Sequence, residues 1–316
     1  PWHHLQSWMK SAMRVLVTGG AGFIGSHLVD RLVSDGHEIC VVDNLTTGFR
    51  ARLDSAIQFH EMDIRDSQLQ SVLRAFKPET IFHLAAQASV PGSITDPSGD
   101  ASVNVMGTLN LLKSCGGLGV ESFVFSSTGG ALYGDPDTLP CTESSPIRPR
   151  SQYGASKAAA EAYVQCFAGL DGYKWSILRY ANVYGPRQDP FGEAGVIAIF
   201  AKRIIDGLPV VVYGDGEQKR DFVYVGDVVE ANVLALNAPS GAYNVGSGIG
   251  TTVNEIRDLI GRTVGLPVST ELSDPRAGDV VRVWLDPSHA SECLNWKASV
   301  GLEEGVTRTV KFLLGT

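Results

Sequence analysis

The stretch Arg14–Leu32, RVLVTGGAGFIGSHLVDRL, decides the fold. Its first five residues, Arg14–Thr18, form a valine-rich run that favours a buried strand, and the residues after the turn have the apolar spacing of a helix. Between strand and helix stand Gly19, Gly22 and Gly25, spaced G-x-x-G-x-x-G. Such a turn lets a pyrophosphate approach the first backbone N–H groups of the helix, where any Cβ would block it. The stretch therefore predicts a dinucleotide-binding turn.

The rest of the first half alternates short runs rich in valine, isoleucine and phenylalanine with longer amphipathic stretches. The predicted strands are Arg14–Thr18, Glu38–Asp43, Ile57–Met62, Thr80–Leu84 and Glu121–Ser126. The predicted helices are Gly22–Ser34, Ser67–Phe76 and about Ala101–Leu118. Strands that alternate with helices are typical of parallel βαβ units, in which both faces of the sheet are buried. The sequence predicts an α/β protein with a Rossmann-type doubly wound parallel sheet.

The pattern changes beyond Tyr180, where a loop rich in glycine and proline precedes a helix at about Val196–Asp206 and a strand at Leu208–Tyr213. The helical pattern of Gly226–Leu236 and the strand AYNVGS then resemble the first half again. We predict two discontinuous domains, a Rossmann domain of residues 13–180 plus about 225–249 and a smaller C-terminal substrate domain of about 181–224 plus 250–316. Residues 1–12, PWHHLQSWMKSA, have no periodicity and are interpreted as a cloning remnant, with Met9 or Met13 as the native start.

Composition narrows the function classes. The 316 residues carry a formal net charge of −8, which argues against a nucleic acid partner because phosphate-backbone binding needs a basic surface. No apolar run approaches the ~18 residues that span a bilayer, so a membrane partner is not expected. Five scattered cysteines without CxxC spacing favour neither disulfides nor a zinc site. We expect no metal and a reducing cytoplasmic location.

An acidic residue stands where a dinucleotide site needs one. Asp43 ends the second predicted strand, where a carboxylate accepts hydrogen bonds from ribose hydroxyls and repels a 2′-phosphate. Since Asn44, Leu45 and Thr46 follow, and no arginine, the sequence favours NAD over NADP. A strand-end cap is the alternative for Asp43. Asp63–Ile64, at the end of the third strand, is a candidate for the adenine edge, with a structural turn as the alternative.

Tyr153 and Lys157 stand four residues apart in SQYGASKAAAEAYV, an alanine-rich stretch that favours a helix. That spacing stacks phenol and ammonium on one helix face. A nearby cation stabilises phenolate, so we expect the pair to lower the tyrosine pKa and to supply a general base for an alcohol. A hydroxyl from the strand end Ser126–Thr128 would complete a Ser/Thr–Tyr–Lys set, with Thr128 and Ser127 as the candidates.

The chain resembles the extended short-chain dehydrogenases/reductases, within the NAD-dependent epimerase/dehydratase family, and is similar to its UDP-glucose (UDP-galactose) 4-epimerase branch. The resemblance covers essentially everything from Met13 onward. It is carried by TGGAGFIGSH (18–27), VVDNLTTG (41–48), MDIRD (62–66), HLAAQASV (83–90), SSTGGALYG (126–134), YGASK (153–157), RYANVYGPRQDPFGEAGVIAIF (179–200), YGDGEQKRDFVYVGDV (213–228) and RAGDV (276–280).

The resemblance implies NAD in the Rossmann domain and a UDP-sugar substrate in the smaller one. Together with the glycine turn and Asp43, the implied cofactor contacts are Phe23, Ile24, Asn44, Thr46, Thr47, Gly48, Asp63, Ile64, Leu84, Ala85, Ala86, Gln87, Asn104, Ser126, Tyr153, Lys157 and Tyr180. The implied substrate contacts are Thr128, Tyr153, Asn182, Gly195, Val196, Val212, Tyr213, Arg220, Arg276, Asp279 and Val283. Arg220 and Arg276 would clamp the diphosphate with paired donors, and surface salt bridges are the alternative for each. His83, in an apolar strand, is expected to be a core residue.

The stretch Thr128–Tyr133 bears on the reaction. It holds no carboxylate, whereas related 4,6-dehydratases carry an Asp-Glu pair there and decarboxylases a Glu close by. The resemblance thus implies 4-epimerisation through transient oxidation at the sugar C4, rotation of the 4-keto sugar and return of the hydride. The alternatives are a UDP-glucuronate 4-epimerase, another NAD-dependent nucleotide-sugar dehydratase or decarboxylase, and an NAD-sensing regulator, whose relatives typically lack the Tyr or the Lys. Asp189 stands where uronate-handling relatives place an arginine, although Arg187 is a possible substitute.

Two further expectations follow from the resemblance. Val283 stands where relatives restricted to glucose and galactose carry a bulky tyrosine, so we expect room for the N-acetyl group of UDP-GlcNAc. A homodimer is implied, through helices around Ala101–Leu118 and Ala155–Phe167.

Overall fold

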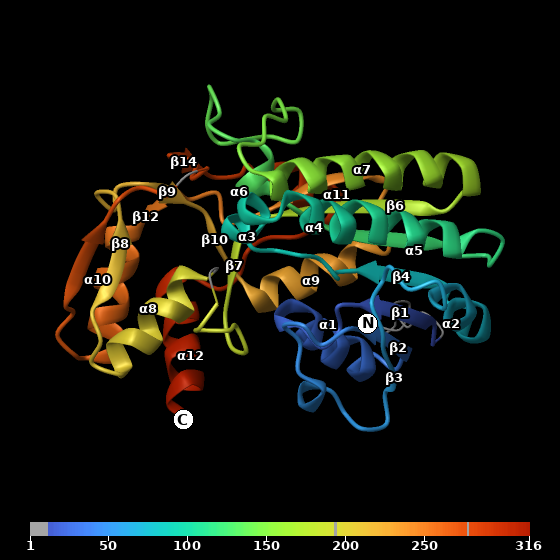
Figure 1. Ribbon diagram of the computed structural model, residues 1–316, viewed down its shortest axis with the longest axis horizontal. Helices are drawn as coiled ribbons and strands as arrows, with labels where there is room; N and C mark the ends of the chain where they lie inside the picture. Colours follow the sequence, from blue (N-terminus) through green and yellow to red (C-terminus); the bar gives the residue numbers. More distant parts are fainter. Residues whose placement is uncertain (1–11, 193–194, 277) are drawn as a thin grey trace, which may run out of the picture.

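Seven parallel strands form the central sheet, in the order β11-β6-β5-β4-β1-β2-β3 (Figure 1). The computed structural model describes residues 12–192, 195–276 and 278–316, so of the predicted remnant only Ala12 lies within the described residues. The strands are β1 (Arg14–Thr18), β2 (Glu38–Asp43), β3 (Gln58–Glu61), β4 (Thr80–His83), β5 (Ser122–Thr128), β6 (Lys174–Tyr180) and β11 (Gly241–Val245). The strand order reverses between β1 and β4, the switch point of a doubly wound sheet. The predicted fold class is confirmed.

Strand alternation explains why both faces of this sheet are buried. Val15 and Val17 of β1 pack into one core cluster with Leu28, while Leu16 packs into the other with Leu73. Helices cover the two faces, as Figure 1 shows for α1 and α9 on one side and α5 and α7 on the other. The helices around the sheet are α1 (Phe23–Ser34), α2 (Leu69–Phe76), α3 (Val90–Thr95), α4 (Pro97–Ala101), α5 (Thr108–Cys115), α6 (Gly129–Leu132), α7 (Gln152–Asp171), α9 (Val225–Ala235), α11 (Ser288–Leu294) and the 3₁₀ turn η1 (Arg50–Arg52).

A smaller unit with its own core lies beside the sheet (Figure 1). Its core joins apolar residues of three helices, among them Phe200, Ile260 and Val306, to those of three short strands. The helices are α8 (Val196–Ile205), α10 (Val253–Val264) and α12 (Leu302–Leu314). The strands are β7 (Asn182–Tyr184), β8 (Val210–Tyr213), β9 (Lys219–Arg220), β10 (Phe222–Tyr224), β12 (Thr251–Thr252), β13 (Thr270–Ser273) and β14 (Arg282–Val283). Helix α11, from the C-terminal stretch, packs instead against α9 and β11.

The helix predicted for Ala101–Leu118 is divided in the structure. A π-helical turn, η2 (Ser102–Gly107), precedes α5 (Thr108–Cys115). A Cβ on Gly107 would come within 2.6 Å of the Ile64 side chain, so glycine allows the loop after β3 to pack closely against this turn. Single π-helical turns are frequent at functional sites, and this one holds Asn104.

No helix in the described parts of the chain is long and apolar enough to cross a membrane. The five cysteines are all free thiols.

Candidate active site and dinucleotide cradle

The glycine turn packs too closely for side chains. A Cβ on Gly25 would lie 2.1 Å from the Gly19 carbonyl oxygen, and a Cβ on Gly19 would lie 2.6 Å from the Ala85 nitrogen. Gly19 also has φ +72°, a left-handed conformation that favours glycine. No side chain caps α1 at Gly22, so its first-turn N–H groups face outward as an anion site. The loop Leu84–Gln87 follows β4 directly against this turn, and the two predicted cofactor segments are neighbours.

Asp43 is buried and fixes the glycine turn to the end of β2. Its Oδ2 accepts a hydrogen bond from the Ala21 N–H at 2.9 Å, and its Oδ1 accepts one from the Leu45 N–H at 2.8 Å. A Cβ on Gly48 would lie 3.0 Å from the same carboxylate. The strand-end cap that the sequence left open as an alternative is therefore present. Each oxygen keeps a second lone pair, so a ribose contact is compatible with it.

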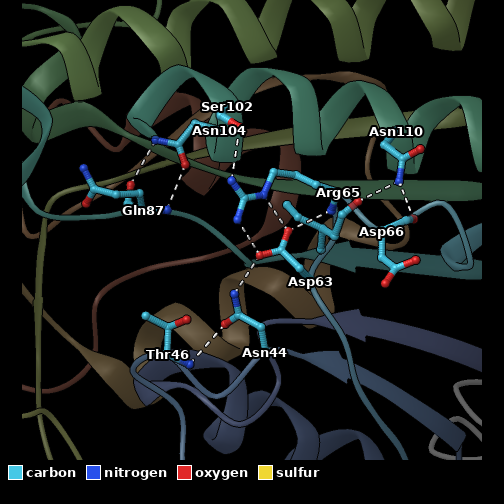
Figure 2. A network of polar contacts seen from close by, with 10 residues as sticks. Asn44, Thr46, Asp63, Arg65, Asp66, Gln87, Ser102, Asn104 and Asn110 are labelled. Atoms are coloured by element: carbon cyan, nitrogen blue, oxygen red, sulfur yellow. Dashed lines mark hydrogen bonds and ion pairs between the residues drawn. The ribbon is translucent and has the colours of Figure 1, made fainter. Parts of the chain in front are cut away.

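A polar network continues from the end of β2 to the end of β3 (Figure 2). The Asp63 carboxylate accepts hydrogen bonds from the Asn44 amide at 2.9 Å and from two Arg65 nitrogens at 2.8 Å. These bonds, those from Arg65 first, hold the pKa of Asp63 at about 2. Asn44 in turn accepts from the Thr46 N–H at 3.1 Å. Thr46 and Thr47 are exposed.

Asn104 links the loop after β4 to the helices (Figure 2). Its amide donates to the Gln87 carbonyl at 2.9 Å and to Ser156 Oγ at 3.1 Å, and its Oδ1 accepts from the Gln87 N–H at 2.9 Å. Asp100 Oδ1 accepts from both amides, at 3.1 Å from Asn104 and 3.0 Å from Gln87. Asn104 therefore holds the loop Leu84–Gln87 against α7. This role is separate from the predicted contact of Asn104 with the cofactor.

A cavity of about 480 Å³ opens between the sheet and the smaller unit, a size in the range of ligand pockets. Its wall includes Thr128 at the carboxyl end of β5, Tyr153 in the first turn of α7 and Asn182, which follows β6 and begins β7. Four arginines line it, Arg150, Arg203, Arg220 and Arg276, against Asp279 as the sole carboxylate among the described lining residues. Although the chain is acidic overall, this cavity attracts an anion.

Tyr153 and Thr128 lie at the same cavity wall, close enough for the Thr128 side chain to favour the ionised form of Tyr153. Helix α7 brings Tyr153 there because Ser151 caps it, accepting the Gly154 N–H at 3.2 Å, and a Cβ on Gly154 would come within 2.5 Å of the Ala131 carbonyl. Lys157, one turn later, is only 4% exposed and has its Nζ 4.3 Å from the centre of the Phe125 ring. Of the predicted Thr–Tyr–Lys set, Thr128 and Tyr153 meet at the cavity wall, and Lys157 lies behind it on the same helix.

The expected lowering of the tyrosine pKa is wrong. Burial raises the pKa of Tyr153 to about 12, and the Thr128 side chain opposes this only in part. Lys157 is itself desolvated, which lowers its pKa to about 8. The pattern Tyr-x-x-x-Lys predicts which groups meet, but burial, which the pattern does not reveal, dominates both values.

The Ser127 side chain does not reach the cavity wall in which Thr128 lies. Its Oγ donates to Glu161 Oε1 at 2.5 Å on the side of β5 that faces α7, so its assignment as a catalytic residue is wrong. Ser126 Oγ bonds the Tyr180 hydroxyl at 3.0 Å, which in turn bonds Asn232. Successive side chains of a strand point to opposite faces of the sheet, so the side chains of Ser126 and Ser127 lie on opposite faces.

The two predicted diphosphate arginines line the same cavity. Arg220, on β9, is largely enclosed, and burial lowers its pKa while the negative charges of Asp279 and Asp135 oppose that shift. The Arg276 guanidinium lies 3.8 Å from the centre of the Tyr213 ring. Both side chains are therefore held at the wall by neighbours, and neither is an ordinary surface salt bridge.

Two valine predictions need correction. Val212 is fully buried in the core of the smaller unit, and Val211 lines the cavity beside Tyr213. Val283, 2% exposed, lines a small adjoining recess with Gly130 and Asn182, which border both spaces. Gly195 and Val196, at the start of α8, line the main cavity as predicted.

Other features escaped sequence reasoning. Asp100, Arg150 and Arg203 lie at the site without any motif to mark them. His83 is a satisfied core residue as expected, bonded to Thr18 Oγ1 at 2.7 Å and Thr108 Oγ1 at 2.8 Å.

The chain is similar to proteins of one known family. Residues 15–246 match the model of the NAD dependent epimerase/dehydratase family. The UDP-glucose 4-epimerase of Mycolicibacterium smegmatis is 46% identical over 307 residues, which cover 95% of this chain and 98% of that protein. Among solved structures, UDP-glucose 4-epimerase of Thermotoga maritima with UDP-glucose matches with a TM-score of 0.94 at 46% identity, over 96% of this chain and 99% of that one. The Thermus thermophilus enzyme, in complex with NAD, matches with a TM-score of 0.93 at 48% identity, over 96% and 100%.

Proposed function

Because this chain belongs to the NAD-dependent epimerase/dehydratase family, we propose that it is an NAD-dependent UDP-glucose 4-epimerase, which interconverts UDP-glucose and UDP-galactose. One observation carries the proposal beyond family membership. A single cavity joins the Tyr153–Thr128 pair, suited to proton transfer with an alcohol, to arginines suited to a diphosphate. A nucleotide-activated sugar has both groups.

The residues of the cradle fit NAD. We propose that the N–H groups at the start of α1 bind the pyrophosphate and that Asp43 binds the adenosine ribose. Asp63 and Ile64 would border the adenine, and Leu84–Gln87 and Tyr180 would border the nicotinamide half. Arg52, which no motif marks, lies near Asp43 but donates to the carbonyls of Ala21 and Arg187 at 3.4 and 2.8 Å.

Tyr153 acts as the proton acceptor for the sugar C4 hydroxyl, and Thr128, which lines the same wall, orients that hydroxyl. Reversible hydride acceptance is the chemistry that bound NAD supplies. Lys157, buried and cationic, stabilises the phenolate form of Tyr153 against the cost of burial. On the return step Tyr153 gives the proton back to the C4 oxygen.

The smaller unit holds the nucleotide. We propose that Arg220 and Arg276 bind the diphosphate, that Val196, Gly195, Tyr213 and Asp279 border the uridine, and that Asn182 contacts the sugar side. We retain the division into residues 13–180 plus about 225–249 for NAD and about 181–224 plus 250–316 for the UDP-sugar, except that α11 (Ser288–Leu294) packs with the Rossmann domain.

The other reactions of the family are less well supported. Water elimination needs an acid beside Thr128, yet Gly129 packs against Leu285, where a Cβ would lie 2.5 Å from its side chain. Uronate binding through Arg187 is disfavoured because its guanidinium pairs with Asp30 of α1 at 2.8 Å. Both Tyr153 and Lys157 are in place, which argues against a regulator without catalysis.

Incubation of the purified protein with UDP-glucose, UDP-GlcNAc and UDP-glucuronate, followed by chromatography of the products, tests the proposal. We expect conversion of UDP-glucose to UDP-galactose. Turnover of UDP-glucuronate alone, or of no UDP-sugar despite bound NAD, would replace it with one of the alternatives.

We propose further that the protein is a cytoplasmic homodimer. The free thiols suit a reducing compartment. Met106 of η2 and Tyr163 and Leu170 of α7 are exposed apolar residues, 58%, 40% and 82% accessible, in or next to the two predicted helical segments. Light scattering at micromolar concentration distinguishes a dimer from a monomer.

A further inference from the structure

A buried ion pair lies behind the catalytic helix. Glu161 of α7 accepts hydrogen bonds from Arg179 of β6, from Nη2 at 2.7 Å and from Nε at 3.1 Å, and the two side chains are 3% and 6% exposed. Neither residue lines the cavity. Buried pairs of this kind contribute little net stability compared with apolar side chains of similar volume. The pair therefore calls for an explanation other than stability.

The pair connects α7 to strand residues next to the site. Glu161 Oε1 also accepts from Ser127 Oγ at 2.5 Å, and Ser127 precedes Thr128 in β5. Arg179 precedes Tyr180 in β6, and its Nη1 donates to the Tyr133 hydroxyl at 3.0 Å. Glu161 thereby ties the helix that carries Tyr153 to the strand that carries Thr128.

Spacing along α7 adds an electrostatic role. Tyr153, Lys157 and Glu161 follow one another at intervals of four, so they lie on one helix face with Cβ atoms of successive residues ~5–6 Å apart. Lys157 faces the Phe125 ring of β5, Asp100 of α4 and His83 of β4, and Tyr153 precedes it by one turn of α7. His83 is neutral, since burial lowers its pKa to about 3. The negative charges that reach Lys157 are those of Glu161 and Asp100.

We propose that Glu161 is a positioning residue for catalysis, which fixes α7 against β5 and keeps the buried Lys157 charged while Tyr153 takes the substrate proton. The inference rests on the proposed function. Burial lowers the pKa of Lys157 to about 8. The negative charges of Glu161, first, and of Asp100 oppose this lowering, as the proposal requires. Without the carboxylate, Lys157 would lose its proton at lower pH.

Two variants separate this role from plain packing. Glu161→Gln keeps the shape and the Ser127 bond but leaves Arg179 buried without a counter-charge, which risks the fold. The double variant Glu161→Gln/Arg179→Met removes both charges and avoids that risk. Ser127→Ala is the matched control, because it removes a hydrogen bond to Glu161 and leaves the charge.

The measurement is the pH profile of kcat for UDP-galactose, with the Lys157 pKa read in parallel from ¹³Cε-lysine NMR. We expect the alkaline limb and the NMR pKa of Glu161→Gln to fall by about one pH unit or more, the effect of losing a nearby opposite charge. Those of the double variant should fall less, because it also loses the positive charge of Arg179, and those of Ser127→Ala should stay in place. A limb and a Lys157 pKa equal to those of wild type in both Glu161 variants would overturn the inference. The NMR titration does not need turnover, so an inactive wild type would refute the proposed function and not this one.

Discussion

Arg220 and Arg276 give the most informative perturbation, because they test the substrate class and leave the cofactor cradle intact. We expect Arg220→Ala and Arg276→Ala each to raise KM for UDP-galactose without lowering the NAD content of the purified protein. Both lie on the smaller unit, away from the glycine turn and Asp43.

The magnitude follows from the surroundings of each guanidinium. Hydrogen bonds to a charged group contribute ~1.5–3 kcal/mol. Arg220 is enclosed enough for burial to lower its pKa, so water screens its charge only weakly. The negative charges of Asp279 and Asp135 partly neutralise it. Arg276 is held on the Tyr213 ring at 3.8 Å, so little side-chain entropy is lost when it binds. We therefore estimate about 2 kcal/mol for each, roughly thirtyfold in KM.

The assay compares inhibition by UDP with inhibition by uridine, which lacks the diphosphate. Each variant should lose about thirtyfold for UDP and almost nothing for uridine, and Arg276→Lys should lie between wild type and Arg276→Ala because it keeps the charge but not the paired donors. Equal losses for UDP and uridine, or unchanged KM in both alanine variants, would show that the diphosphate binds elsewhere.

Tyr153→Phe should lower turnover by ~10²–10⁴-fold with NAD retained, measured by steady-state kinetics; a rate above about a tenth of wild type would refute the general-base role. Asp43→Ala should weaken the binding of NAD by ~1–3 kcal/mol and that of NADP less. If titration gives an unchanged ratio of the two affinities, the role of Asp43 is only structural, through its bonds to the Ala21 and Leu45 N–H groups. The wild type should convert UDP-GlcNAc as well as UDP-glucose, whereas Val283→Tyr should lose UDP-GlcNAc first, because a ring too large for the recess must enter the space beside Asn182; wild type without activity on saturating UDP-GlcNAc would contradict this. The folded protein binds fewer protons than the unfolded chain between pH 3 and 6.5 at His83, whose pKa burial lowers to about 3, so this group destabilises the fold as pH falls, by about 2 kcal/mol between pH 7 and pH 5. Urea unfolding of wild type and of His83→Gln at pH 7 and pH 5 tests this. The free energy of unfolding should change less with pH in the variant, by about 2 kcal/mol. The same pH dependence in both proteins would refute the lowered pKa of His83.

Local patterns predicted the parts of the site that are themselves local. The strand–glycine–helix turn and the i, i+4 spacing of Tyr153 and Lys157 depend on neighbouring residues, and the structure has them where the sequence indicated. Successive side chains of a strand point to opposite faces, which explains why Ser127 is separated from Thr128 and Val212 from Tyr213.

Contacts between distant segments left no trace in the sequence. Arg203 of α8 and Arg150 reach the cavity only because two cores pack side by side. The pKa of Tyr153 depends on its burial, and burial is a property of the assembled fold.

The central claim is that the hydrogen at the sugar C4 leaves as hydride and returns to the same carbon. UDP-galactose carrying deuterium at C4, converted in ordinary water and examined by mass spectrometry, tests this directly. The account predicts UDP-glucose that retains the deuterium at C4. Product without the label, or no product from protein that holds NAD, would contradict it.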